Sequence, residues 1–104
     1  MPDTQVLPVH GDIYEAEEDF AIIYKTILVE SFSDTGKATF PAGERLIIDT
    51  CGRKGLQVYC DAVNYDSLEA LIVPETLRAS PNYSGYYFHF AITTLLQHCK
   101  KISR

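Results

Sequence analysis

The chain has 104 residues, of which 46% are hydrophobic, and its formal net charge at pH 7 is −5. This length and apolar content favour one domain with one hydrophobic core. The acidic balance argues against direct nucleic-acid binding, which usually needs a basic surface. No apolar stretch reaches the roughly 18 residues of a membrane-spanning helix, which argues against a membrane protein.

The cysteine pattern favours a reducing compartment. Cys51, Cys60 and Cys99 are an odd number and lack a CxxC spacing. No positive cluster followed by an apolar run marks the N-terminus as a signal peptide. We therefore expect a cytoplasmic protein with reduced cysteines, and the sequence predicts no cofactor.

The N-terminal region combines an expected arm with a cluster of acids. Residues 1–12 hold two prolines and a glycine, which predicts an arm that is mobile unless a partner fixes it. A short acidic helix over 13–19 is an open possibility. The acidic side chains offer a surface for a basic protein partner or an imitation of nucleic-acid phosphates; they are Glu15, Glu17, Glu18 and Asp19.

The next segments predict a strand and then a loop. The run FAIIYKTILVE at 20–30 is rich in β-branched and aromatic residues, which favours a strand. A helix stays open, because apolar residues from Ile13 to Ile27 also recur every three or four positions. The composition of SFSDTGKATFPAG at 31–43 is typical of a loop, with Phe40 placed to fold back onto the core.

A β-hairpin is predicted from the alternation on either side of the loop CGRKG. The positions expected on its apolar side are Leu46, Ile48 and Thr50 before the loop, and Leu56, Val58, Cys60 and Ala62 after it. In that position Cys60 would be an inert core residue with a raised thiol pKa. Cys51, beside two cations in the loop, would be the more reactive cysteine.

A further strand is predicted at LEALIV, 68–73, ending at Pro74, which cannot donate to a sheet ladder. The segment PETLRAS predicts one helical turn followed by a short strand. Over residues 20–80, the order of a long loop, a strand and a proline at a helical turn resembles that of SH3-like small barrels. The positions that carry this resemblance are Phe40, Gly43, Glu44, Leu46, Ile48 and Pro74.

The resemblance implies the fold and not the ligand. Signalling SH3 domains use a Trp in their peptide groove and a Tyr after the proline, whereas this chain has no Trp and carries Leu77 there. Recognition of proline-rich peptides is therefore not implied.

The C-terminal block predicts a helix from about 84 to 102, because Phe88, Leu95 and Ile102 lie on one helical face. A strand from Tyr86 to Ile92 followed by a shorter helix stays open. Either way the block carries more apolar side chains than one small sheet covers, which indicates a homodimer or another protein partner. The aromatic contact residues expected for it are Tyr83, Tyr86, Tyr87 and Phe90.

A metal site is not expected from the remaining donors. On a helix, His98 and Cys99 would point about 100° apart, and His89 would lie more than two turns away. Catalytic residues are not predicted either, because no nucleophile has an assigned base.

Together these observations predict an α+β protein, with a small SH3-like barrel or strongly bent antiparallel sheet of about five strands and a C-terminal helix. The expected function is a non-enzymatic protein-interaction or accessory module, acting as a homodimer. The alternative is a small-molecule-binding protein or enzyme, with a pocket between barrel and helix that uses Tyr59, Tyr87 or His89. A third possibility is an acidic inhibitor that imitates phosphates and targets a nucleic-acid enzyme.

Overall fold

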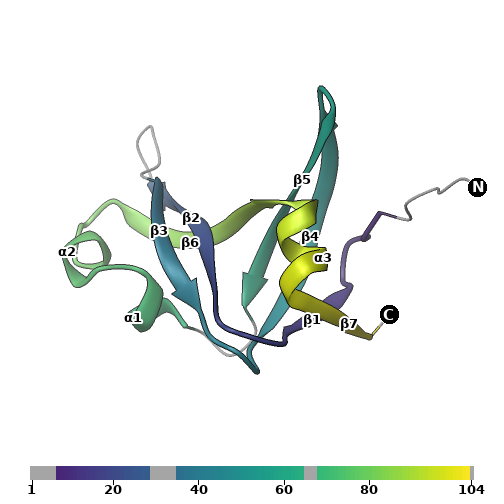
Figure 1. Ribbon diagram of the computed structural model, residues 1–104. Helices are drawn as coiled ribbons and strands as arrows, with labels where there is room; N and C mark the ends of the chain where they lie inside the picture. Colours follow the sequence, from purple (N-terminus) through teal and green to yellow (C-terminus); the bar gives the residue numbers. More distant parts are fainter. Residues whose placement is uncertain (1–6, 29–34, 65–67, 104) are drawn as a thin grey trace, which may run out of the picture.

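The computed structural model describes residues 7–28, 35–64 and 68–103. These residues form one antiparallel sheet of seven strands that curls into a half-barrel, together with three short helices (Figure 1). The strands are β1 (Ile13–Ala16), β2 (Phe20–Leu28), β3 (Thr35–Phe40), β4 (Arg45–Lys54), β5 (Gln57–Asn64), β6 (Tyr83–Ala91) and β7 (Cys99–Ser103). The helices are α1 (Glu69–Ile72), α2 (Glu75–Arg78) and α3 (Ile92–His98).

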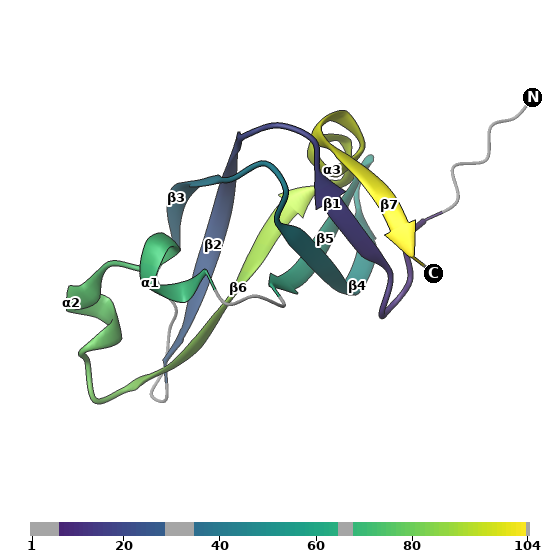
Figure 2. The same cartoon turned by 90° about the horizontal axis from the view of Figure 1, so that it is seen from below.

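The strand order is β3-β2-β6-β5-β4-β1-β7, so the middle of the sheet is formed by segments far apart in the sequence. Figure 2 shows β1 and β7 side by side at one end and α1 and α2 beside β2 and β3 at the other. The sheet is therefore more extensive than the predicted five strands. The coarse prediction of a strongly bent antiparallel sheet is confirmed, and the SH3-like resemblance stays a prediction.

The core lies on the inner face of the curled sheet, where alternate side chains of the strands meet. Phe40 and Phe88 are fully buried there, with ring centroids 5.4 Å apart in an edge-to-face arrangement. The Phe20 ring also packs against Phe40, with ring centroids 5.5 Å apart. Burial of each such ring stabilises the fold by about 1.5–3 kcal/mol, and α3 closes this core with Ile92 and Leu95.

The predicted helix over 84–102 is wrong. Residues 83–91 form β6, which pairs with β2 on one side and β5 on the other. Phe88 and Phe90 point into the core, while Tyr87 and His89, which alternate with them, are only partly buried. This two-residue period satisfies both neighbouring strands, and α3 begins only at Ile92. The alternative of a strand followed by a shorter helix is closer to the structure.

The N-terminal predictions also need correction. The possible acidic helix over 13–19 is wrong, because Ile13–Ala16 is strand β1, with Tyr14 and Ala16 buried. Of the expected arm, residues 1–6 lie outside the described part of the chain. Residues 7–12 lie against the sheet: Gly11 N donates to Ile48 O, and Ile48 N donates to Asp12 O, both at 2.8 Å.

The strand predicted from residue 20 is confirmed as β2 up to Leu28, and residues 29 and 30 lie outside the described ranges. The predicted loop at 31–43 is wrong for Thr35–Phe40, which is edge strand β3. Its full register with β2 supplies the pairing that its loop-like composition does not indicate.

The predicted strand at 68–73 is wrong, because Glu69–Ile72 forms α1. The Asn64 side-chain carbonyl accepts a 3.0 Å hydrogen bond from Leu68 N where the chain leaves β5. The expected turn after Pro74 is confirmed as α2, and residues 79–82 continue as turns instead of a strand. This connection buries Ile72 and Val73 at the end of the core.

The hairpin is confirmed as β4 and β5, with Leu46, Ile48 and Val58 buried. Its strands run further than predicted, so Leu56 lies at the turn after Gly55, whose φ is +66°, and is 98% exposed. The placement of Leu56 in the core was therefore wrong. Thr50 is also exposed, because a bulge between Ile48 and Thr50 shifts the alternation.

Cys51 and Cys60 lie directly opposite each other in this hairpin and form a disulfide, with their Cα atoms 4.1 Å apart. The expectation of reduced cysteines is therefore wrong for this pair, as are a reactive Cys51 and a free Cys60 thiol. Register explains the bond: the extended β4 brings Cys51 into the strand instead of the turn. Cys99 is free and buried. None of the described helices is long and apolar enough to cross a membrane, and the cytoplasmic location stays a prediction.

Candidate functional site

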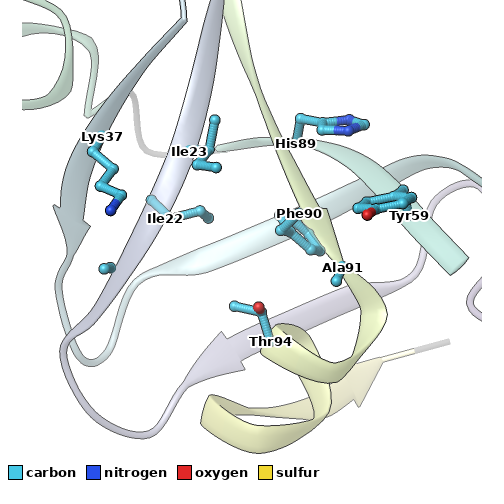
Figure 3. Close-up of a pocket in the computed structure, with 9 residues that line it drawn as sticks. Ile22, Ile23, Lys37, Tyr59, His89, Phe90, Ala91 and Thr94 are labelled. Atoms are coloured by element: carbon cyan, nitrogen blue, oxygen red, sulfur yellow. The ribbon is translucent and has the colours of Figure 1, made fainter. Parts of the chain in front are cut away.

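A pocket of about 290 Å³ lies where β2, β3, β5 and β6 meet the start of α3 (Figure 3). The β2–β6 pairing ends at Ile23 and His89, and the residues next to that end, Ala21, Ile22, Phe90 and Ala91, line the pocket. Its floor and walls are mainly apolar. The lining residues are Ala21, Ile22, Ile23, Lys37, Tyr59, His89, Phe90, Ala91 and Thr94.

Strand register places two polar lining residues, Lys37 and His89, in one row across the sheet. Lys37 pairs with Ile23, Ile23 pairs with His89, and His89 pairs with Asp61, so the row crosses β3, β2, β6 and β5. Tyr59 lies in the neighbouring row, opposite Ala91. Residues separated by up to 73 positions in the chain (21 to 94) thus line one site.

One wall of the pocket is a pair of stacked rings. The His89 imidazole lies on Tyr59, with ring centroids 5.3 Å apart and planes 8° apart. Its Nδ1 lies 2.7 Å from Asp61 Oδ1, which holds the ring in place. Nε2 has no hydrogen-bond partner within the described part of the chain. The wall is therefore aromatic, and its imidazole is held in place by a carboxylate outside the pocket lining.

Lys37 stands across the pocket from these rings, with Ile23 between them in the close-up (Figure 3). It is exposed, and its side chain forms no ion pair or hydrogen bond with any described residue, while its backbone pairs with β2. Thr94, at the start of α3, adds a hydroxyl. This arrangement can hold a flat apolar group between two walls and place a polar group near an amine.

Two of the three residues named for a pocket from the sequence, Tyr59 and His89, line this one, and Tyr87 does not. Lys37 and Thr94 were missed. Lys37 belongs to a segment with the composition of a loop, and Thr94 would be an ordinary surface residue of a long helix. Only the outward positions of the β2 alternation could have indicated Ala21 and Ile23.

The acidic residues named from the sequence are partly compensated within the chain. Glu15 in β1 lies opposite Lys100 in β7. Glu18 Oε2 lies 2.6 Å from His98 Nδ1, and Asp19 Oδ1 accepts a 2.8 Å hydrogen bond from Ala42 N. Glu17 is exposed. The acidic and basic ends of the sequence therefore meet in one part of the sheet.

The four aromatic residues named from the sequence do not share one surface. Tyr83 and Tyr86 pack against the core, and the Tyr83 hydroxyl donates a 2.6 Å hydrogen bond to Glu69 Oε2 in α1. Burial raises the pKa of both tyrosines above its ordinary value. Phe90 is 5% exposed, and Tyr87 lies between the inward-facing positions. Any partner would therefore meet Tyr87 apart from the other three.

The three residues considered as metal ligands from the sequence have different surroundings in the structure. His89 belongs to the pocket wall, and His98 stacks on Phe20 with ring centroids 4.8 Å apart. Burial raises the pKa of the Cys99 thiol to about 12. Within the described ranges, no group of three or more His, Cys, Asp or Glu side chains is arranged to hold a metal ion.

Comparisons with known proteins add no family to this description. No protein-family model matches the chain, and no curated protein or solved structure matches it.

Proposed function

We propose that this protein is a non-enzymatic binding protein that takes a small molecule in the pocket beside α3. The observation that carries the proposal is the apolar cavity of about 290 Å³ between the stacked Tyr59 and His89 rings and Lys37. Its size is near the lower end of small-molecule sites, and it combines mainly apolar walls with a few polar groups, as such sites do. This is the alternative function considered from the sequence.

Binding without turnover fits the polar groups of the site. A nucleophilic enzyme pairs its hydroxyl or thiol with a base at hydrogen-bond distance. Among the described residues, His89 has its one side-chain hydrogen bond with Asp61, and the lining hydroxyls of Tyr59 and Thr94 are not hydrogen-bonded to it. The His89–Asp61 pair therefore holds one wall of the pocket in place and activates none of these hydroxyls as a nucleophile.

Filling the pocket should abolish binding. Ala21 is an exposed lining residue of β2, so Ala21→Phe places a ring in the cavity without entering the core. In a thermal-shift screen of metabolites, a compound at a hundred times its Kd should stabilise the wild type by about 2.7 kcal/mol, and Ala21→Phe should lose that gain.

The matched control is Val63→Phe, which adds a ring at a 41% exposed position of β5 outside the pocket. It should respond to the compound as the wild type does. A compound that stabilises Ala21→Phe as much as Val63→Phe would contradict binding in this pocket.

A protein-interaction module is the second candidate, favoured by the end of the β4–β5 hairpin. Leu56 is 98% exposed there, beside the exposed cations Arg53 and Lys54. An exposed apolar side chain at the end of a hairpin can insert into a partner protein. The sequence analysis expects that partner to be a second copy of the chain. Sedimentation at micromolar concentration should then show a dimer that Leu56→Ser dissociates; a wild-type monomer would rule the dimer out.

The acidic inhibitor is less favoured. Two of the carboxylates it would need, those of Glu15 and Glu18, lie near Lys100 and His98 of the same chain. That arrangement lowers the negative potential available to imitate phosphates.

A further inference from the structure

The charged groups around the pocket differ in whether a described side chain already pairs with them. Asp61 is bound by His89 Nδ1 and does not line the pocket. Lys37 lines it and has no partner among the described residues. Among the described lining residues, Lys37 is the one Lys, Arg, Asp or Glu, so it brings a positive charge to the pocket although the chain as a whole carries −5.

We propose that the pocket selects an organic anion, namely a flat apolar ring system that carries one carboxylate or similar group. This inference rests on the proposed function and names its ligand class. The ring system lies against Ile23 and the stacked rings of Tyr59 and His89, and the anionic group lies at the Lys37 ammonium.

The shape of the site limits the size of such a ligand. A volume of about 290 Å³ corresponds to roughly ten water volumes at ~30 Å³ each, which is close to a bicyclic aromatic acid. The Tyr59 and His89 rings offer aromatic surface with which a ligand ring can make offset or edge contacts. Ala21 and Ala91 keep the floor low enough for a ring to enter.

The position of Lys37 suits an anion at the open side of the pocket. Lys37 lines the cavity from an exposed position, so its apolar stem can cover the wall while its ammonium group keeps contact with water. Lysine on an edge strand also discourages edge-to-edge association of sheets. That second role predicts no difference between charged and neutral ligands, so ligand charge is the variable that separates the two roles.

The test uses two probes of matched shape, naphthalene-2-carboxylate and naphthalene-2-carboxamide. Binding to the whole chain is followed by ¹H–¹⁵N NMR at the amides of Ile23, His89 and Ala91, at low and high salt. We expect the carboxylate to bind about three- to tenfold more tightly than the carboxamide at low salt, and salt to reduce this ratio.

Lys37→Gln should remove the preference by weakening carboxylate binding about three- to tenfold while leaving carboxamide binding unchanged. Lys54→Gln is the matched control, because Lys54 is an exposed lysine at the far end of β4 and its loss changes the net charge equally. It should keep the preference.

The outcomes separate this inference from the proposed function. Equal binding of both probes at the pocket amides overturns the anion selectivity, and an equal loss of preference in Lys37→Gln and Lys54→Gln overturns its assignment to Lys37. Both results leave small-molecule binding standing. If neither probe shifts the pocket amides and the metabolite screen shows no stabilisation that Ala21→Phe abolishes, both fail.

Discussion

Replacing Phe88 with alanine is expected to lower the free energy of unfolding by about 3–5 kcal/mol. The Phe88 side chain is fully buried, packs edge-to-face on Phe40 at 5.4 Å and contacts Tyr86 at 5.5 Å. Truncation removes the buried ring and leaves a cavity in a strand held on both sides by β2 and β5. Since domains of this size are stable by about 5–15 kcal/mol, the loss is a large fraction of the total.

The neighbouring residue supplies the control. Tyr87 lies on the other face of β6 and is only partly buried, so Tyr87→Ala should cost about 1 kcal/mol. Urea unfolding followed by circular dichroism measures both variants. Similar losses for the two would contradict the strand, because a two-residue period requires neighbours to differ.

The strands that could be predicted are those whose own residues carry the period. In β4, the alternation of Leu46 and Ile48 with Arg45, Ile47 and Asp49 indicates the core side before any partner is known. In β5, Val58 and Cys60 do the same. A hairpin between them needs only local pairing, so both its strands and its approximate turn could be inferred from the sequence.

The C-terminal block could not be resolved this way, because its apolar residues satisfy two periods. Phe88, Leu95 and Ile102 have helical spacing, yet they belong to β6, α3 and β7. The deciding influence is tertiary: β2 and β5 leave a place between them that a strand fills by hydrogen bonding on both edges. The same holds for Ile13–Ala16, which pairs with β4 and β7.

The candidate site was only partly predictable for the same reason. Tyr59 and His89 attract attention by residue type, because aromatic and imidazole side chains commonly bind ligands. Lys37 joins them only through the register of β3 on β2, which places it beside Ile23. The local composition of a segment that is typical of a loop does not predict long-range register of this kind.

Reducing the Cys51–Cys60 disulfide is expected to lower the free energy of unfolding by about 2.5 kcal/mol. The bond joins residues nine positions apart, and closing a loop of that length restricts the unfolded chain by about this amount. Oxidised protein should therefore unfold at a higher urea concentration than protein kept in a reductant. Cys51→Ser should unfold near the reduced wild type and should not respond to the reductant.

Counting thiols with a chromogenic disulfide reagent provides an independent measure. In the folded oxidised protein Cys99 should react slowly, because it is buried and its raised pKa leaves little thiolate at neutral pH. Unfolding without reductant should expose that one thiol, whereas unfolding after reduction should expose all three cysteines of the chain. Three reactive thiols in protein unfolded without reductant, together with a urea midpoint that reductant does not change, would show that the hairpin is held by strand pairing alone.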